Sequence, residues 1–558
     1  MLIPKLFTCI KGYSKNQFIK DFTSGIIVAI IAFPLSIALA IASGVSPEKG
    51  LYTAIVGGFI VSFLGGSRVQ IGGPTGAFVI LVYETIHTYG LDGLIISTII
   101  AGIFLLLMGF FRFGSIIKYI PDPITSGFTA GIAITIFSTQ IKDFLGLTMN
   151  NVPSEFLSKW VAYIKSMPTT NFETLFIGAL SLVIVFAWPR INKKIPGTLI
   201  AIIVSTLITA IFHLNVETIG SRYGSMSASL PAPTIPHVSL QLIKNLLLPG
   251  FTIAVLAAVE SLLSAVVADG MVGGKHRSNM ELIAQGAANI ASVLFGGIPV
   301  TGAIARTAAN IKNGGRTPVA GIVHSISLLI IMSLFLPYMK LVPMTTLAAI
   351  LIMVSYNMGE WEVFKRLSKA PKSDTAVFLV TFSLTVFLDL VYAIGIGIVF
   401  ASLLFMKRMA DVSDVKYIFD ANEDEDAPEF LAEVTTPYGI SFYEINGPFF
   451  FGAADKFINV IRETNYSSKV LIVKMSNVPA MDATAYHGLE MLYDMCNKTH
   501  TRLIFIGLQP QPENVLRKYG FFDIVGEENF CSSLEEAISR AEELTTTQVH
   551  KYSLSISD

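Results

Sequence analysis

GGPTGAFVIL (residues 72–81) and GGIPVTGAIARTAANI (residues 296–311) are two short apolar stretches, each opened by glycine and proline. They share the string Thr-Gly-Ala, which begins at Thr75 in the first and at Thr301 in the second, an offset of 226 (301 − 75). The same offset needs no gap when it is extended along the chain, and it pairs Ala32 with Ala258, Pro34 with Glu260, Gly44 with Gly270 and Lys49 with Lys275. This pattern indicates an internal repeat in which the two stretches are corresponding parts.

The composition of the chain is that of a membrane protein. Of its 558 residues, 52% are hydrophobic and only 14% are charged, whereas soluble domains carry roughly 25% charged residues. A hydrocarbon core about 30 Å thick needs about 20 apolar residues per helix. Fourteen apolar segments are predicted, centred in residues 24–43, 51–64, 74–88, 94–111, 123–140, 174–188, 196–212, 246–268, 281–295, 303–311, 317–336, 341–356, 375–389 and 390–407.

The offset divides these fourteen segments into seven plus seven. An odd number of spans per repeat puts the two halves in opposite orientations across the membrane, which is the architecture of many secondary transporters. Four lysines precede the first span, and Lys407 and Arg408 follow the last. Because positive charge marks the cytoplasmic side, both termini are expected in the cytoplasm of a multi-pass protein of the inner (cytoplasmic) membrane. The N-terminus lacks the apolar core of a cleaved signal peptide.

A change of composition near residue 411 marks a second domain. We predict a cytoplasmic segment at 1–20, a transmembrane domain at 21–410 with repeats at about 21–213 and 246–410, a polar linker at 411–435 with an acidic run at 423–426, an α/β domain at 436–545 and a tail at 546–558. Strands are predicted at 440–445, 470–475 and 502–507, with helices at 454–463, 484–497 and 534–543. Short strands alternating with helices are typical of a small α/β domain.

Several classes of function have no support in the sequence. A net charge of −1 gives no reason to expect a nucleic-acid partner, and three scattered cysteines form neither a disulfide framework nor a metal-ligand pattern. The chain lacks a Walker A string, an HExxH motif and a GxSxG motif between strand and helix. We therefore expect neither an enzyme nor a cofactor.

The two short stretches suggest an anion site. A helix that begins inside the membrane leaves unpaired backbone N–H groups and about half a positive charge at its N-terminus, and two facing ends can bind an anion without a lysine. The donors would be Thr75, Gly76 and Ala77 at one end and Thr301, Gly302 and Ala303 at the other. Arg306, three residues further on, would strengthen the positive field or else pair with a carboxylate. The alternative is a kinked packing helix without a ligand.

Glu260 is the only charged residue between Phe251 and Ala268. Since a charge at the centre of the membrane costs about 2.5–3.5 kcal/mol on insertion scales, Glu260 is predicted to carry a coupling ion. It would do so by protonation or by binding Na⁺ together with Ser264. A structural ion pair with Arg306 is the alternative.

Four further residues in the spans are singled out. Phe33 and Pro34 are expected to break the first helix and to gate or line the site, or simply to form a packing kink. His324 is expected to be a hydrogen-bonded core residue, and Glu84 is expected near the membrane interface.

With these residues in view, the chain resembles the sulfate permease (SulP) anion transporters. The resemblance rests on FPLSIALAIASGVSPEKGLYTAIVGGF, on GGSRVQIGGPTGAF, on AAVESLLSAVVADGMVGGKHRSNMELIAQGAANI and on GGIPVTGAIARTAANIKNGGRTP. It implies a dimer in which a core bundle moves against a gate bundle. It also implies that the anion lies between the third and tenth helix ends, at the positions of Thr75–Ala77 and of Ala303, Ile304, Ala305 and Arg306, with Glu260 linked to coupling. Leu35 and Leu39 depart from residues common in the family, so the substrate stays open among sulfate, bicarbonate, chloride and dicarboxylates.

The C-terminal part is similar to the STAS domain of that family, through SFYEINGPFFFGAADKF and VLIVKMSNVPAMDATAYHGLEML. STAS domains resemble anti-sigma-factor antagonists that are phosphorylated on a serine, and the matching position here is Thr484. This threonine is a candidate phosphorylation site, and the alternatives are a structural loop or a surface for a cytoplasmic protein partner.

The expected function is coupled secondary transport of small inorganic anions of the sulfate or bicarbonate class, by an elevator-like movement with H⁺ or Na⁺ symport. An uncoupled anion channel or exchanger on the same fold and dicarboxylate uptake remain alternatives. A nucleobase permease would call for polar side chains in place of bare helix ends. A membrane-tethered regulator would not need broken helices.

Overall fold

The computed structural model describes residues 2–115, 121–149, 152–153, 155–192, 195–224, 226–234, 236, 240–388, 390–420, 439–463 and 468–554. The chain divides into two compact units, Met1–Ala401 and Ser402–Asp558, and each is described by itself. Six helices of the described residues are long and apolar enough to cross a membrane, and α9 is a shorter apolar helix. The acidic run predicted at 423–426 lies outside the described residues.

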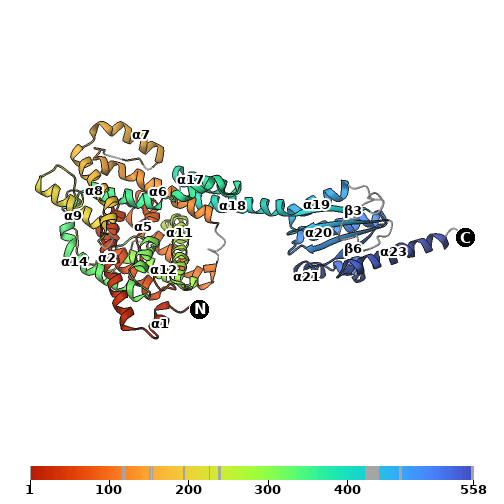
Figure 1. Cartoon of the computed structure of the whole chain (residues 1–558). Helices are drawn as coiled ribbons and strands as arrows, with labels where there is room; N and C mark the ends of the chain where they lie inside the picture. The colour runs from red at the N-terminus through yellow and green to blue at the C-terminus, as the bar shows by residue number, and fades with distance from the viewer. Residues whose placement is uncertain are drawn as a thin grey trace. The chain divides into compact units, whose positions relative to one another are not determined.

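The first unit is helical (Figure 1). Its first half contains α1 (Lys5–Cys9), α2 (Lys15–Ala42), α3 (Pro47–Tyr52), the π-helix η1 (Thr53–Gly57), α4 (Gly58–Leu64), β1 (Gly72–Gly73), the 3₁₀ turn η2 (Gly76–Phe78), α5 (Val79–Phe110), α6 (Asp122–Leu145), α7 (Phe156–Ser166), the 3₁₀ turn η4 (Met167–Thr169), α8 (Phe172–Ile191), α9 (Gly197–Ile211) and α10 (Ile219–Tyr223). Its second half contains α11 (Leu240–Val272), α12 (Ser278–Leu294), β2 (Thr301–Gly302), α13 (Ile304–Lys312), α14 (Val319–Met339), α15 (Met344–Met358), α16 (Trp361–Arg366), the 3₁₀ turn η5 (Leu367–Lys369), α17 (Lys372–Phe387) and α18 (Leu390–Val412).

Each of the fourteen predicted segments coincides with a helical element. The third and fourth are joined in α5, which is divided by Gly90 at φ 72°, a left-handed conformation that glycine adopts without a steric penalty. The break expected at Pro34 is wrong, because α2 continues from Lys15 to Ala42 with Pro34 inside it. A proline removes only one hydrogen bond of the helix, and most of the neighbouring residues of α2 are buried against other helices.

The helices of the first unit form two groups. In the first group, α5 packs closely on α11 and α12, and α14 packs on α2 and α4. In the second group, α6 packs on α15 and α17, and α8 packs on α9 and α15. We call the first group (α2–α5 and α11–α14) the core bundle and the second (α6, α8, α9, α15 and α17) the gate bundle. Small residues permit the closest approaches, since a Cβ on Gly102 of α5 would lie 2.8 Å from the carbonyl oxygen of Gly286 in α12.

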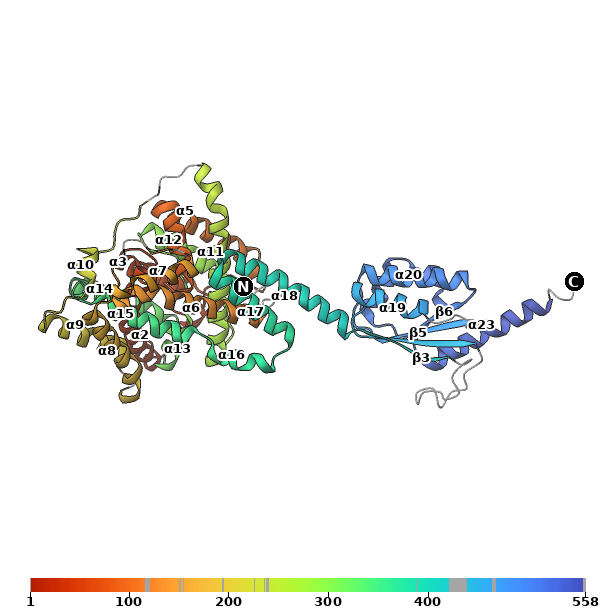
Figure 2. The ribbon, with the colours of Figure 1, turned by 90° about the horizontal axis from the view of Figure 1, so that it is seen from above.

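The second unit is an α/β domain. Its five-stranded sheet has the order β3 (Asp414–Asp420), β4 (Ile440–Asn446), β5 (Val470–Asn477), β6 (Arg502–Ile506) and β7 (Phe530–Cys531), and only the β3–β4 pair is antiparallel. Successive side chains of a strand point to opposite faces, so the strands contribute to two separate apolar clusters. One face is covered by α19 (Phe451–Glu463), α20 (Ala483–Lys498), α21 (Pro510–Lys518) and α22 (Phe521–Val525), and the other is covered by α23 (Leu534–Leu554) (Figure 2).

The predicted elements of this domain lie where they were expected, but its limits differ. Strand β3 lies inside the segment 411–435 that was expected to be a linker, and it pairs along its length with β4. Helix α23 continues to Leu554 and so enters the predicted tail at 546–558. The two short elements α21 and α22 were not predicted.

Candidate functional site

The two glycine- and proline-rich stretches meet in the core bundle. Strands β1 and β2 pair antiparallel, with Gly72 opposite Gly302 and Gly73 opposite Thr301. The N–H of Ala303 extends the pairing by donating to the carbonyl of Ile71 at 2.9 Å. Because β1 leads into η2 and α5 while β2 leads into α13, the antiparallel pair sends two helices outward in opposite directions from one point. We call this point the helix crossing.

Both helices begin at the crossing with unpaired amides. In α13 the first helical hydrogen bond is donated by Thr307 N–H to Ala303 at 2.9 Å, so the amides of Ile304, Ala305 and Arg306 precede it. In η2 the first such bond is donated by Phe78 N–H to Thr75 at 3.3 Å, so the amides of Gly76 and Ala77 precede it. No side chain of the described residues caps either end. Two positive helix ends therefore converge on one small region.

Not all of the expected donors are available. The Thr301 hydroxyl lies 2.6 Å from the Ser261 hydroxyl and donates to the carbonyl of Ala257 at 3.2 Å. The Gly302 amide donates to Ser261 at 3.3 Å, and the Ala303 amide is used in the strand pairing. Thr75 differs from Thr301, because its buried hydroxyl has no hydrogen-bond partner among the described residues. The donors that remain are the amides at 76–77 and 304–306 and the hydroxyl of Thr75.

Arg306 connects the two helix ends. Its guanidinium is 3% exposed, and its Nη2 donates to the carbonyl of Pro74 in the opposite stretch. Its Nη1 is buried without a partner in the described part of the chain. A Cβ on Gly73 would lie 2.2 Å from that Nη1, so glycine is needed for the approach of the arginine. A buried guanidinium with an unused donor adds positive charge to a region that is already positive.

Glu260 lies beside the crossing on α11. Its side chain is partly buried, and within the described residues it forms no ion pair with Arg306, which argues against the structural pair considered as an alternative. The next residue, Ser261, contacts Thr301 as described above. One turn later, the Ser264 hydroxyl donates to Thr307 Oγ1 at 3.4 Å, and Thr307 Oγ1 also accepts from Ile71 N–H at 3.0 Å. The segment that carries Glu260 is thus bound to the second stretch of the crossing, and Thr307 of that stretch binds Ile71 directly ahead of β1.

The gate bundle reaches the crossing directly. A Cβ on Gly76 would lie 2.9 Å from Cδ1 of Ile136 in α6 and 3.1 Å from the sulfur of Met358 in α15. Phe33 of α2 is buried in the large apolar cluster that also contains Ala77 and Phe78. Ile136 and Met358 were not predicted, because nothing in the sequence relates them to residue 76.

A polar face of α12 holds the approaches to both strands. Glu281 accepts from the amides of Gly66 at 2.8 Å and Ser67 at 3.1 Å, ahead of β1. Two turns later, Asn289 accepts from Val300 N–H at 3.0 Å and donates to Val300 C=O at 2.8 Å, ahead of β2. Gln285 lies between them and donates to Glu281 at 2.9 Å. These three residues were not predicted, although their i, i+4, i+8 spacing was available as a signal.

Two other residues have environments that bear on the predictions. The expectation that His324 is hydrogen-bonded is wrong, since both ring nitrogens are buried without a partner among the described residues. In the second unit, Thr484 is exposed in the first turn of α20. The N-cap of that helix is Asp482, which accepts from Ala485 N–H at 2.8 Å.

The chain is similar to known proteins along most of its length. Family models match the chain for the sulfate permease family at residues 18–381 and for the STAS domain at residues 432–537. YvdB of Bacillus subtilis (strain 168), which is provisionally named a sulfate transporter, is 39% identical over 528 residues that cover 94% of this chain and 98% of YvdB. The bicarbonate transporter BicA of Picosynechococcus is 28% identical over 543 residues that cover 93% of this chain and 94% of BicA.

Solved structures show the same fold. The murine anion transporter Slc26a9 in its inward-facing state matches with a TM-score of 0.86 at 20% identity, over 97% of this chain and 94% of that one. The transmembrane domain of a cyanobacterial BicA matches with a TM-score of 0.62 at 26% identity, over 70% of this chain and 98% of that one. The chain therefore belongs to the sulfate permease family, with a STAS domain at its C-terminus.

Proposed function

We propose that the protein is a secondary active transporter of small inorganic anions of the sulfate or bicarbonate class, and that the helix crossing is its substrate site. The observation that carries the proposal is the convergence of two uncapped helix starts beside the buried guanidinium of Arg306. Such a site favours an anion and offers little to a neutral solute. The names of the relatives YvdB and BicA point to sulfate and bicarbonate respectively.

Glu260 is the proposed site of coupling. Its segment of α11 is hydrogen-bonded to β2 through Ser261 and to α13 through Ser264. A negative charge on Glu260 would oppose an anion at the crossing, and protonation or a bound Na⁺ would remove that opposition. Binding of the cation and of the anion would therefore support each other, which is the requirement for symport.

The two bundles provide the proposed movement. The crossing, Arg306 and Glu260 all belong to the core bundle, whereas Ile136 and Met358 of the gate bundle face Gly76 from outside it. A core bundle that carries the anion past a fixed gate bundle would give elevator-like alternating access. We further propose a homodimer in the cytoplasmic membrane, with both termini in the cytoplasm.

The test is uptake into proteoliposomes that contain the purified full-length protein. Labelled sulfate, bicarbonate, chloride and a dicarboxylate are offered separately, each without a gradient, with an imposed pH gradient and with an imposed Na⁺ gradient. We expect saturable uptake of sulfate or bicarbonate, and accumulation driven by only one of the two gradients. Uptake that ignores both gradients would contradict symport, and failure to take up any of these anions would contradict the proposed function as a whole.

A further inference from the structure

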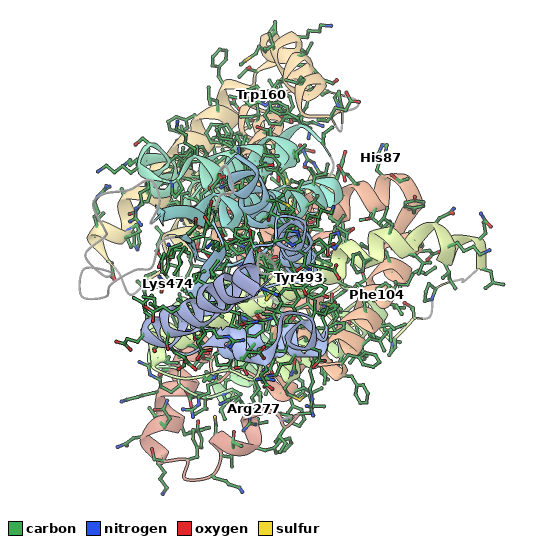
Figure 3. The ribbon with its side chains drawn as sticks, turned by 90° about the vertical axis from the view of Figure 1, so that its right-hand side faces the viewer. His87, Phe104, Trp160, Arg277, Lys474 and Tyr493 are labelled. Carbon is green, nitrogen blue, oxygen red and sulfur yellow. The ribbon has the colours of Figure 1, made fainter. Side chains whose placement is uncertain are left out.

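A second cavity lies in the first unit, beneath the short helix α7. In Figure 1, α7 and α1 lie at opposite ends of this unit, and in Figure 3 Trp160 of α7 and Arg277 are likewise well separated. We call these two ends the α7 face and the α1 face. The cavity has a volume of about 170 Å³ and is lined from α2, α5, α6, α7 and α10. Because a water molecule occupies about 30 Å³ in the liquid, the cavity has room for a small oxyanion.

Two polar groups of α7 line this cavity without a partner. The side chain of Lys159 is buried at 6% exposure, and within the described residues its ammonium forms neither a hydrogen bond nor an ion pair. Tyr163 is 1% exposed, and its hydroxyl is buried without a partner among the same residues. The two residues are four positions apart and so lie on one face of α7. Leaving a buried donor unsatisfied costs free energy, and the cost is larger for a charged donor.

The other cations that line the cavity have hydrogen-bond partners, which leaves Lys159 as the lining cation without one among the described residues. Lys142, Lys159 and Arg222 line it together with Glu84 and Asp143. Asp143 is engaged, because it accepts from Arg222 at 2.7 and 3.1 Å. Glu84 has an interaction of its own, and its charge also acts on Lys159. Lys142 donates to the carbonyl of Met149 at 3.1 Å, and Arg222 is bound by Glu217 as well as by Asp143.

The protonation states agree with a site for an anion. Burial lowers the pKa of Lys159, and the nearby charge of Glu84 opposes that decrease. Burial raises the pKa of Tyr163 above its usual value, so the phenol stays a neutral hydrogen-bond donor. An acceptor with negative charge would satisfy both donors and would keep the ammonium charged.

The cavity also adjoins the helix crossing. Val79 and Ile80, which begin α5 directly after η2, are part of its lining. The cavity therefore reaches the start of α5, which directly follows Gly76 and Ala77 in the chain. We propose that Lys159 and Tyr163 form a second anion-binding site, which receives the transported oxyanion on the α7 face before it moves to the crossing. This inference rests on the proposed function.

The test measures the apparent KM for labelled sulfate and labelled bicarbonate from each face separately. Full-length protein is reconstituted, and vesicles of the two orientations are sorted by the accessibility of a C-terminal tag. We expect Lys159→Gln to raise the KM for anion offered at the α7 face about tenfold or more, since a hydrogen bond to a charged group is of that size. Without a gradient kcat/KM is the same from both faces, so it should fall by the same factor for anion offered at the α1 face. There the change should appear in kcat, and the KM should stay unchanged. Tyr163→Phe should have a smaller effect in the same direction.

Two control variants separate a binding role from a structural one. Lys159→Arg keeps the charge and should keep the KM near that of the wild type. Lys165→Gln removes an exposed lysine of the same helix and should have no effect. Should Lys159→Gln fail to fold, Tyr163→Phe decides by the same measurement. An unchanged KM for Lys159→Gln would overturn the proposed entry site, and so would an equal rise of the KM at both faces. In either case the cavity would hold water, and Glu84 would balance the charge of Lys159. Failure of the wild type to transport either anion would instead refute the proposed function.

Discussion

Glu260 is the residue at which coupling can be tested most directly. Glu260→Gln keeps the size of the side chain and removes its titratable charge. We expect it to abolish gradient-driven accumulation while the anion still exchanges down its own gradient, because the crossing itself is unchanged. Glu362→Gln is a matched control, since the Glu362 side chain is 81% exposed on α16. Accumulation by Glu260→Gln at the level of the wild type would refute the coupling role.

Gly73 tests whether the position of Arg306 matters for transport. An added Cβ would lie 2.2 Å from Nη1 of Arg306, so Gly73→Ala must displace the guanidinium from the carbonyl of Pro74. We expect uptake to fall at least tenfold. The thermal unfolding temperature should fall as well, because Gly73 has φ 159°, a conformation that residues with a side chain rarely adopt, so uptake is compared per amount of folded protein. The control is Gly270→Ala in α11, where a Cβ meets nothing within 4 Å and where alanine favours the helix. Normal uptake by Gly73→Ala would contradict a role of Arg306 in the site.

A local rule located the two helix starts from the sequence, whereas the break expected at Pro34 is wrong and the coupling role of Glu260 stays a prediction. Glycine and proline at 72–76 and 296–302 mark the two helix starts, and a lone carboxylate in an apolar run marks Glu260. The contacts of Ser261 and Gln70 could not be predicted from the sequence, because their partners are far away in the chain. Gln70 Nε2 donates to the carbonyl of Ser261, which lies 191 positions further on. The sequence also could not show that the predicted donor Thr301 is already engaged, since its hydroxyl contacts residues of another helix.

Helix α12 acts as a support for the crossing, and Asn289 is its most sensitive point. Asn289 is fully buried and forms both hydrogen bonds to the backbone of Val300. Asn289→Ala leaves a buried amide and a buried carbonyl unpaired, and we expect a loss of about 2–3 kcal/mol of stability. Thermal unfolding of the purified protein measures this loss. Asn313→Ala removes one exposed hydrogen bond, to Ala309, and should leave the unfolding temperature nearly unchanged. Equal effects of the two variants would contradict the supporting role of α12.

Helices and strands were predicted correctly from the sequence mainly where the chain has an apolar segment. Each of the fourteen apolar segments coincides with a helical element, because a segment inside a membrane can satisfy its backbone only as a helix. Helix α7 was not predicted, since it is short and amphipathic and carries Lys159 and Lys165 in a stretch without a long apolar run. Strand β3 was missed because it borders a strongly acidic run and pairs with a strand that lies twenty residues further along the chain.

The division of the whole molecule into two units has a consequence for truncation. A chain that ends at Val412 keeps the helical unit and α18, and it loses the complete sheet of the STAS domain. A chain that ends at residue 430 keeps β3 without its partner β4, and an unpaired strand is prone to pair with other chains. We expect both truncated chains to insert into the membrane, and we expect the longer one to aggregate more strongly after extraction in detergent. Size-exclusion chromatography of the two proteins measures the difference. Loss of membrane insertion in both truncated chains would show that the helical unit needs the STAS domain to fold. Equal aggregation of the two chains in detergent would show that β3 without its sheet does not promote aggregation.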